Sequence, residues 1–256
     1  MQRARGGRLA QCDLAWPHVN LARVSESLPV VLIPGLLASA RMYAAQIPPL
    51  WRAGPVMIAD HTRDDSMSAI ARRILAAAPA RFALAGLSMG GYVAFEMLRQ
   101  APERIAKLAL LDTSARADAP EQTAMRRAQM TLAAQERLAE VVEQQFPRLV
   151  HRARRGDLAL RELFTLMAEE VGASAFIRQQ SAILGRSDSR ATLGSIRCPT
   201  LVLVGEADEL TPPERAAEIT AGISAAHLVT VPQCGHMSAL EQPDAVTRAL
   251  LEWLQA

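Results

Sequence analysis

A serine, an aspartate and a histidine stand in three short segments whose residue types suit covalent catalysis. The serine is Ser88, within the pentapeptide Gly-Leu-Ser-Met-Gly that runs from Gly86 to Gly90. Glycines on both sides allow a strand to turn sharply into a helix, and such a turn presents the hydroxyl beside free helix N–H groups. Ser88 is therefore a candidate nucleophile, although small residues also occupy tight turns for steric reasons alone.

A serine hydroxyl becomes an effective nucleophile when a histidine takes its proton and a carboxylate orients that histidine. Asp208 follows the apolar run that ends at Val204, and His236 follows the apolar run that ends at Val231. In an open α/β fold, the carboxyl ends of parallel strands meet at one edge of the sheet. We therefore predict that Ser88, Asp208 and His236 form one catalytic site.

Other acidic residues compete for the role of the carboxylate. Asp112 follows the apolar run that ends at Leu111, and capping of its own loop is the alternative role for this residue. Glu206 and Glu209 lie beside Asp208, where we expect solvated loop charges. We prefer Asp208 as the carboxylate and keep Asp112 as the alternative.

The remaining histidine and cysteine candidates have weaker signals. His61 follows an apolar run, so it either lines the rim of the site or has a surface or capping role. Cys234 lies close to His236, but we expect a buried structural thiol because no base is left to ionise it. Cys12 and Cys198 form no C-x-x-C pair with it, which supports neither a disulfide framework nor a structural zinc site.

The predicted secondary structure alternates between strands and helices on either side of one long helical segment. Continuous apolar runs indicate strands that are covered on both faces, as in a parallel sheet flanked by helices. These runs are Val30 to Ile33, Val56 to Ala59, Phe82 to Leu87, Lys107 to Leu111, Thr200 to Val204 and His227 to Val231. Helical patterns cover Ser68 to Ala78 after a cap at Asp65 or Ser66, Gly91 to Gln100, and Pro243 to Leu254.

The alternation stops after Leu111, and residues from Ala119 to about Arg190 show helical periodicity without a convincing strand. We predict a core of residues 1–112 and 196–256, with 113–195 inserted as a helical lid over the carboxyl ends of the strands. Most Met and Phe residues of this segment should pack internally, and some should line a pocket.

Composition favours a protein that acts on small molecules. The 256 residues are 50% hydrophobic, 21% charged and only 4% aromatic, with a formal net charge of +2. This balance favours neither disorder nor nucleic-acid binding. No apolar run approaches a membrane span, and residues 9–20 are too polar for a signal-peptide core. We expect a cytoplasmic protein that binds neither nucleic acid nor membrane.

Four segments together resemble the α/β-hydrolase superfamily, from about Pro29 to the end of the chain. They are Pro34-Gly35-Leu36-Leu37, Gly86-Leu87-Ser88-Met89-Gly90-Gly91, Gly205-Glu206-Ala207-Asp208 and Gly235-His236. The resemblance implies an α/β-hydrolase fold, that is, a mostly parallel central sheet flanked by helices with a helical lid insertion. It implies Ser88 as nucleophile, His236 as general base and then acid, and Asp208 as the orienting carboxylate.

The resemblance also implies an oxyanion hole made by the backbone N–H groups of Leu36 and Met89, and no cofactor or metal. Where it has been measured in other enzymes, each such donor stabilises the transition state by roughly 3 kcal/mol. Two features depart from the superfamily pattern. Many relatives have His-Gly where this chain has Pro34-Gly35, and the expected amino-terminal hairpin within Leu9 to Val24 should be short or irregular because its alternation is poor.

The resemblance is to small serine esterases (carboxylesterases), carrier-protein methyl ester esterases and enol-lactonases. It implies a serine hydrolase that cleaves a carboxylic ester or lactone through an acyl-serine intermediate. A cofactor-free perhydrolase or haloperoxidase, or a carbon–carbon bond hydrolase, would use the same three residues. A non-catalytic ligand receptor on the same fold is a third alternative.

A cluster of four arginines lies inside the helical segment. Arg148, Arg152, Arg154 and Arg155 either form a solvated helix face or recognise an anionic partner such as an acyl carrier protein that bears the substrate. In its placement, the cluster resembles the basic lid residues by which some esterases dock a carrier protein.

Overall fold

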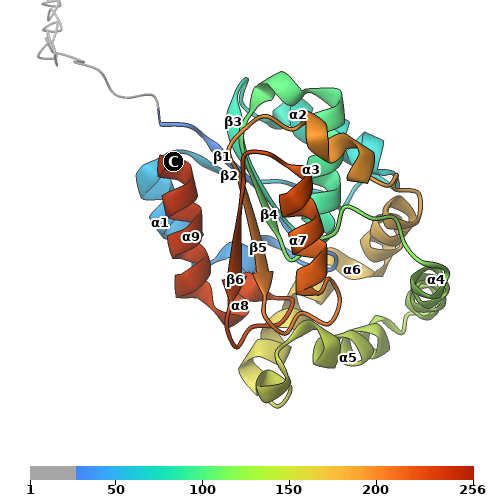
Figure 1. The fold of residues 1–256 in the computed structure, drawn as a ribbon. Helices are drawn as coiled ribbons and strands as arrows, with labels where there is room; N and C mark the ends of the chain where they lie inside the picture. Colours follow the sequence, from blue (N-terminus) through green and yellow to red (C-terminus); the bar gives the residue numbers. More distant parts are fainter. Residues whose placement is uncertain (1–26) are drawn as a thin grey trace, which may run out of the picture.

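Six parallel strands form the centre of the molecule in the computed structural model, which describes residues 27–256. The expected amino-terminal hairpin within Leu9 to Val24 lies outside the described residues. Along the sheet the order is β2-β1-β3-β4-β5-β6 (Figure 1). The strands are β1 (Val30–Ile33), β2 (Val56–Ile58), β3 (Phe82–Leu87), β4 (Ile105–Leu111), β5 (Thr200–Gly205) and β6 (Ala226–Val231).

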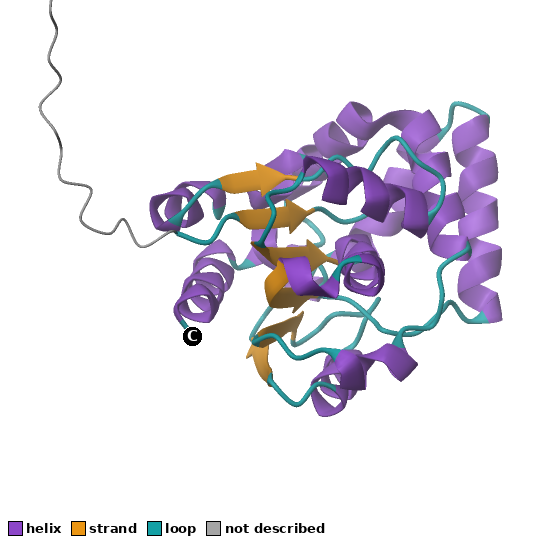
Figure 2. Ribbon diagram, turned by 90° about the horizontal axis from the view of Figure 1, so that it is seen from above, coloured by secondary structure: helices purple, strands orange, loops and turns teal. Residues whose placement is uncertain are grey.

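Helices cover both faces of the sheet, as the continuous apolar strands require (Figure 2). One face packs against α1 (Ile47–Ala53) and α9 (Pro243–Gln255), through side chains such as Leu50 and Leu250. The other face packs against α2 (Met67–Ala77), α3 (Met89–Gln100) and α7 (Pro213–Gly222). Ser66 caps α2, because its hydroxyl accepts a hydrogen bond from the Ala69 N–H. The sheet order and its helical layers are those of the α/β-hydrolase fold.

The segment between β4 and β5 contains helices and short 3-10 turns. Its helices are α4 (Pro120–Ala134), α5 (Leu138–Leu149) and α6 (Leu158–Leu184), and its 3-10 turns are η3 (Arg152–Arg154) and η4 (Arg190–Ser195). Figure 1 shows α4, α5 and α6 grouped beyond one end of the sheet. Phe146, Phe164, Met167 and Phe176 are buried between these helices and the core, which agrees with the internal packing expected from the sequence.

Helix α6 changes direction at Gly172, whose φ of 76° lies in the left-handed region that favours glycine. The half that follows Gly172 belongs to the main body of the protein, because Ala182 and Ile183 pack in the same buried cluster as α2 and α3. The insertion is therefore built into the core at its carboxyl end. None of the helices in residues 27–256 combines the length and apolarity that spanning a bilayer would need.

Short 3-10 turns and one short helix complete the fold. They are η1 (Ala40–Tyr43), η2 (Pro102–Arg104) and α8 (Ser238–Glu241). Helix α8 directly follows the loop that carries His236, and η1 follows the loop that carries Leu36. The carboxyl ends of β1, β3, β4, β5 and β6 thus gather the loops that carry Leu36, Ser88, Asp112, Asp208 and His236.

Candidate active site

The backbone of Ser88 has the strained geometry expected between β3 and α3, with φ 55° and ψ −113°. Its flanking glycines are required by close backbone contacts. A Cβ atom on Gly86 would lie 2.3 Å from the Gly90 carbonyl oxygen, and one on Gly90 would lie 2.1 Å from the Ile33 oxygen. The Thr113 hydroxyl also donates a 2.8 Å hydrogen bond to the Ser88 carbonyl oxygen. These contacts fix the position of the serine hydroxyl.

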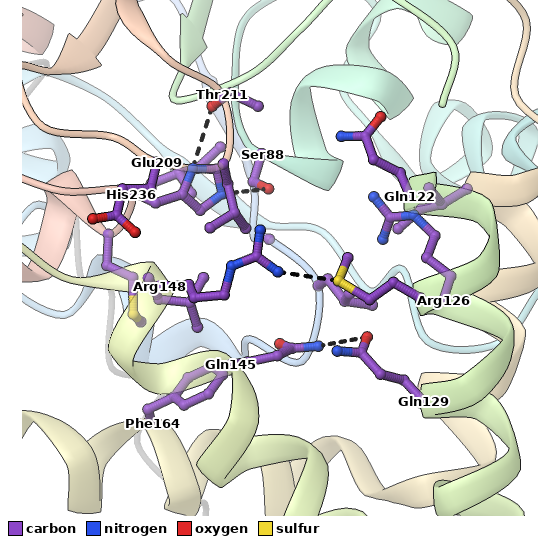
Figure 3. A pocket seen from close by; sticks show the side chains of 18 of the residues that line it. Ser88, Gln122, Arg126, Gln129, Gln145, Arg148, Phe164, Glu209, Thr211 and His236 are labelled. Atoms are coloured by element: carbon purple, nitrogen blue, oxygen red, sulfur yellow. Dashed lines mark hydrogen bonds between the residues drawn. The ribbon is translucent and has the colours of Figure 1, made fainter. Parts of the chain in front are cut away.

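The loop after β6 places His236 against this hydroxyl. Nε2 of His236 lies 2.8 Å from Ser88 Oγ, and Nδ1 lies 2.8 Å from Asp208 Oδ2 (Figure 3 shows Ser88 and His236). Because an ionised carboxylate can only accept, Nδ1 carries the hydrogen and Nε2 is the acceptor for the serine proton. The structure therefore brings together the three residues that the sequence selected.

Donors from its own loop hold the Asp208 carboxylate. Oδ1 accepts hydrogen bonds from the Leu210 and Thr211 N–H groups at 2.8 and 2.9 Å, and Oδ2 accepts one from the Thr211 hydroxyl at 2.7 Å. Burial alone would raise the pKa of Asp208, but the charge of His236 and these donors lower it below its ordinary value. Asp208 is thus a buried carboxylate that remains ionised.

The same interaction acts on the histidine in the opposite direction. Burial of His236 would lower its pKa, but the adjacent Asp208 charge raises it above the ordinary value. A raised pKa makes the imidazole a better proton acceptor at the moment when the serine attacks.

The alternative carboxylate, Asp112, lies nearby but does not bond to His236. Its Oδ1 accepts a 3.0 Å hydrogen bond from the Gly205 N–H, and its Oδ2 is paired with the Ser238 hydroxyl. Complete burial and the neighbouring Asp208 charge raise the pKa of Asp112 to about 8, so its carboxyl group is mainly protonated at neutral pH. Asp112 thus connects the loop after β4 to the end of β5 and to the start of α8.

The loop after β1 carries Leu36 beside Ser88 and is held on several sides. Gly35 O lies 2.9 Å from Nε2 of the buried His61, and the Gly35 N–H contacts Met42 Sδ at 3.4 Å. Leu37 has a left-handed φ of 56°, and its N–H donates to Gln179 Oε1 at 3.2 Å. His61 is thus buried under this loop and lies neither at the rim nor at the surface; its contact with the Gly35 carbonyl oxygen is closest to the capping role considered for it.

Leu36 lines the cavity above Ser88, and Met89 is the first residue of α3, where a backbone N–H has no acceptor within the helix. Both N–H groups therefore belong to backbone that adjoins the serine, one at the end of β1 and one at the end of β3. This placement is compatible with the donors that the sequence selected for an oxyanion.

Contacts from α6 extend along this side of the site. Glu170 accepts a hydrogen bond from the Ser39 hydroxyl and pairs with Arg41, each at 2.6 Å, and Arg178 Nε donates to the Thr62 carbonyl oxygen at 2.9 Å. Sequence reasoning missed Gln179, because a buried glutamine in a helix forms no motif. The available signal was the pair Gln179 and Gln180 inside an otherwise mostly apolar stretch.

A cavity of about 160 Å³ opens above Ser88 and His236. The core contributes Leu36, Leu87 and Tyr92 to its wall, and the inserted segment contributes Met125 and Phe164. As expected, some Met and Phe residues of the insertion thus line a pocket. Figure 3 shows that α4 and α5 add several polar side chains, among them Gln129, Gln145 and Arg148.

The arginines that the sequence grouped together have separate environments. Arg148 lines the cavity, and Arg154 pairs with Asp157 at 2.6 Å. Arg155 pairs with Glu209, also at 2.6 Å, while Arg152 is exposed on η3. Cys234 is fully buried, and burial raises the pKa of its thiol, which fits the structural role predicted for it.

Comparison with known proteins agrees with this architecture. Residues 30–249 match the model of the Alpha/beta hydrolase family. An esterase of Thermogutta terrifontis, solved with malate bound, is 31% identical with a TM-score of 0.81, and the alignment covers 89% of each chain.

Two curated relatives are more distant in sequence. A pimeloyl-[acyl-carrier protein] methyl ester esterase of Nitrosomonas europaea is 29% identical over 189 residues, which are 70% of this chain and 74% of the relative. A Mycobacterium tuberculosis protein named as a non-heme bromoperoxidase is 26% identical over 187 residues, 69% of this chain and 68% of the relative. The family match over most of the chain shows that this protein belongs to the alpha/beta hydrolase family.

Proposed function

We propose that the protein is a serine hydrolase that cleaves a carboxylic ester or a lactone through an acyl intermediate on Ser88. The observation that supports this proposal is the continuous hydrogen-bonded series from Ser88 Oγ through His236 to Asp208 at the base of a cavity. The esterase relatives agree with the class of reaction.

In the proposed reaction, Ser88 Oγ attacks the ester carbonyl carbon while His236 Nε2 takes the hydroxyl proton. The carbonyl oxygen becomes an oxyanion that accepts hydrogen bonds from the Leu36 and Met89 N–H groups. Collapse breaks the carbon–oxygen bond, and His236 returns its proton to the departing alcohol oxygen. A water molecule then attacks the acyl-serine with the same base and releases the acid, so Asp208 stabilises the imidazolium in both halves of the reaction.

The direct test is covalent labelling with a fluorophosphonate probe, followed by mass spectrometry of the peptide that contains Ser88. We expect the folded protein to carry one adduct on Ser88, and the heat-unfolded protein to carry none, because reactivity depends on the assembled site. Absence of an adduct on the folded protein would favour the non-catalytic receptor over the hydrolase.

A perhydrolase or haloperoxidase is the second candidate, because one relative is named as a non-heme bromoperoxidase. In that reaction, hydrogen peroxide replaces water in the attack on the acyl-serine and the product is a peracid. Incubation with acetate and peroxide, with peracid formation measured beside ester hydrolysis, distinguishes the two activities. A carbon–carbon bond hydrolase would use the same residues on a ketone substrate.

A substrate bound to an acyl carrier protein is a finer form of the esterase proposal. The exposed Arg152 on η3 and the carrier-protein esterase relative support it. Arg152→Glu should lower turnover of a carrier-linked ester and leave a free short ester unaffected, whereas the exposed Arg197→Glu should affect neither substrate. Equal rates of the Arg152 variant and the native protein on the carrier-linked ester would contradict this form.

A further inference from the structure

The cavity wall opposite the core carries several polar side chains of α4 and α5. Gln122 and Gln129 come from α4, and Gln145 and Arg148 come from α5 (Figure 3). These polar side chains lie beside apolar ones such as Met125, and a wall of this mixed kind suits a substrate with both an apolar part and a polar group. The polar residues therefore indicate a polar group on the substrate.

The orientation of the Gln129 amide follows from its neighbours. Arg126 can only donate, so the 2.9 Å contact with its Nη1 must be made by Gln180 Oε1. Gln180 Nε2 then faces Gln129 and donates to Gln129 Oε1 at 3.2 Å. Gln145 Nε2 donates to the same oxygen at 3.1 Å.

With its oxygen engaged twice, Gln129 must turn its NH₂ group away from both neighbours. The residue is only 5% exposed and lines the cavity, and within residues 27–256 its Nε2 has no hydrogen-bond partner. The side chain is thus held in place while its donor stays available to a ligand or water in the cavity. Gln129 thus offers a fixed hydrogen-bond donor to whatever occupies the cavity.

Arg148 supplies a positive charge to the same cavity. Its Nη1 contacts Met125 Sδ at 3.1 Å, and it forms no salt bridge with a carboxylate of residues 27–256. Figure 3 shows its guanidinium group directed into the cavity, between Gln145 and the side of Ser88.

The other charged side chains that line the cavity are compensated. Arg126 pairs with Asp118 at 2.7 Å, and Glu209 pairs with Arg155 at 2.6 Å. Within the part of the chain that the structure describes, Arg148 is the cavity-lining cation that lacks a carboxylate partner.

We propose that Gln129 and Arg148 form a subsite for a carboxylate on the acyl part of the substrate. A guanidinium group binds a carboxylate through two parallel charge-assisted hydrogen bonds, and the Gln129 N–H adds a third donor. A cavity of about 160 Å³ is close to one that holds a benzene-sized molecule, which suits a short acyl chain. The inferred substrates are half-esters of short dicarboxylic acids, or lactones that bear a carboxylate.

This inference rests on the proposed hydrolase and names its substrate class. The test compares kcat/KM for methyl hydrogen adipate with that for methyl hexanoate, because the two esters differ mainly in a terminal carboxylate. We expect the native protein to prefer the half-ester by about tenfold or more, which corresponds to about 1.4 kcal/mol. Arg148→Met should bring the ratio close to one, because it keeps an unbranched side chain of similar length and removes the charge.

Two further variants sharpen the comparison. Arg127→Met removes the same charge from the exposed face of α4 and should retain the preference. Gln129→Glu keeps an oxygen for Gln145 and Gln180 but replaces the donor with a second oxygen, so it should lower the preference even if the Arg148 variant does not fold. An unchanged ratio in folded Arg148 and Gln129 variants, or a native preference for methyl hexanoate, would overturn the subsite.

Binding separates the subsite from the chemistry. Calorimetric titration of Ser88→Ala with methyl hydrogen adipate and with methyl hexanoate should show tighter binding of the half-ester, and the added Arg148→Met change should remove the difference. Equal binding of both esters would overturn the subsite even if Ser88 of the native protein is labelled by fluorophosphonate. Selective binding of the half-ester without labelling of the native protein would leave the subsite in place and contradict the hydrolase.

Discussion

Replacement of Ser88 by alanine is expected to lower kcat for a short nitrophenyl ester by about 10⁶-fold, the scale of loss when the nucleophile of a serine hydrolase is removed. The change removes the hydroxyl that His236 Nε2 contacts and retains the Cβ atom, so the backbone at φ 55° faces no new steric conflict. The two proposed oxyanion donors, Leu36 and Met89, would remain, and we expect them to give a residual rate above that of water.

The measurement is steady-state hydrolysis at matched protein concentrations, with the folding of each variant checked by circular dichroism. Ser195→Ala is the matched control, because Ser195 is an exposed serine outside the cavity and should retain native turnover. Near-native activity in the Ser88 variant would mean that another residue supplies the nucleophile, and the proposed mechanism would fail.

Asp208→Asn should lower kcat by about 10⁴-fold, since an amide in this position can stabilise the wrong tautomer of the histidine. The Asn side chain can donate to His236 Nδ1, which moves the hydrogen to Nε2 and prevents this atom from accepting the Ser88 proton. The expected loss is in kcat, because Asp208 lies behind His236 and away from the substrate.

The pH profile gives a second readout of the same change. His236 must be neutral to act as the base, so kcat/KM should fall as the pH drops through its pKa, which lies above the ordinary value of 6.5. Removal of the Asp208 charge takes away what raises this pKa, so any residual activity of the variant should fall at a lower pH. If the fall in activity occurs at the same pH in the variant as in the native protein, Asp208 does not act through His236.

Asp112→Asn is the matched comparison, because both carboxylates are buried and Asp112 is the alternative acid. With a pKa raised to about 8, Asp112 is already mainly neutral, and an amide can accept from Gly205 and donate to Ser238 in the same geometry. We expect turnover within about tenfold of the native protein, a difference of less than about 1.4 kcal/mol in the barrier. A larger loss in this variant than in Asp208→Asn would reverse the assignment of the acid.

Features that depend on apolar runs and short motifs were predictable from the sequence. The six strands were identified because each reads as a mainly apolar run; the inner strands are buried on both faces, as Phe82–Leu87 is, whereas the edge strands β2 and β6 are only partly buried. Asp208 and His236 were identified because each directly follows such a run, so the fold must bring them to the same edge of the sheet as Ser88.

Features that depend on packing between distant elements were not predictable. The position of His61 under Gly35 follows from the path of a loop, and the orientation of Gln129 follows from Arg126 through Gln180. Neither arrangement has a local pattern. The polar character of the cavity wall was missed for the same reason, since helical periodicity in α4 and α5 shows which residues share a face but leaves open what that face meets.

The kink at Gly172 divides the inserted segment into two parts, and sequence changes in the two parts should have different consequences for the site. The residues that follow or closely precede it hold the loops beside the serine, through Gln179 to Leu37 and through Glu170 to Ser39. Helices α4 and α5 carry polar residues of the cavity wall, and the Leu149 carbonyl oxygen at the end of α5 accepts hydrogen bonds from the His236 and Met237 N–H groups. A graft of α4 and α5 from a relative that stops before Leu149 should therefore exchange substrate preference while retaining the geometry around Ser88, whereas a graft that extends past residue 169 would alter both together.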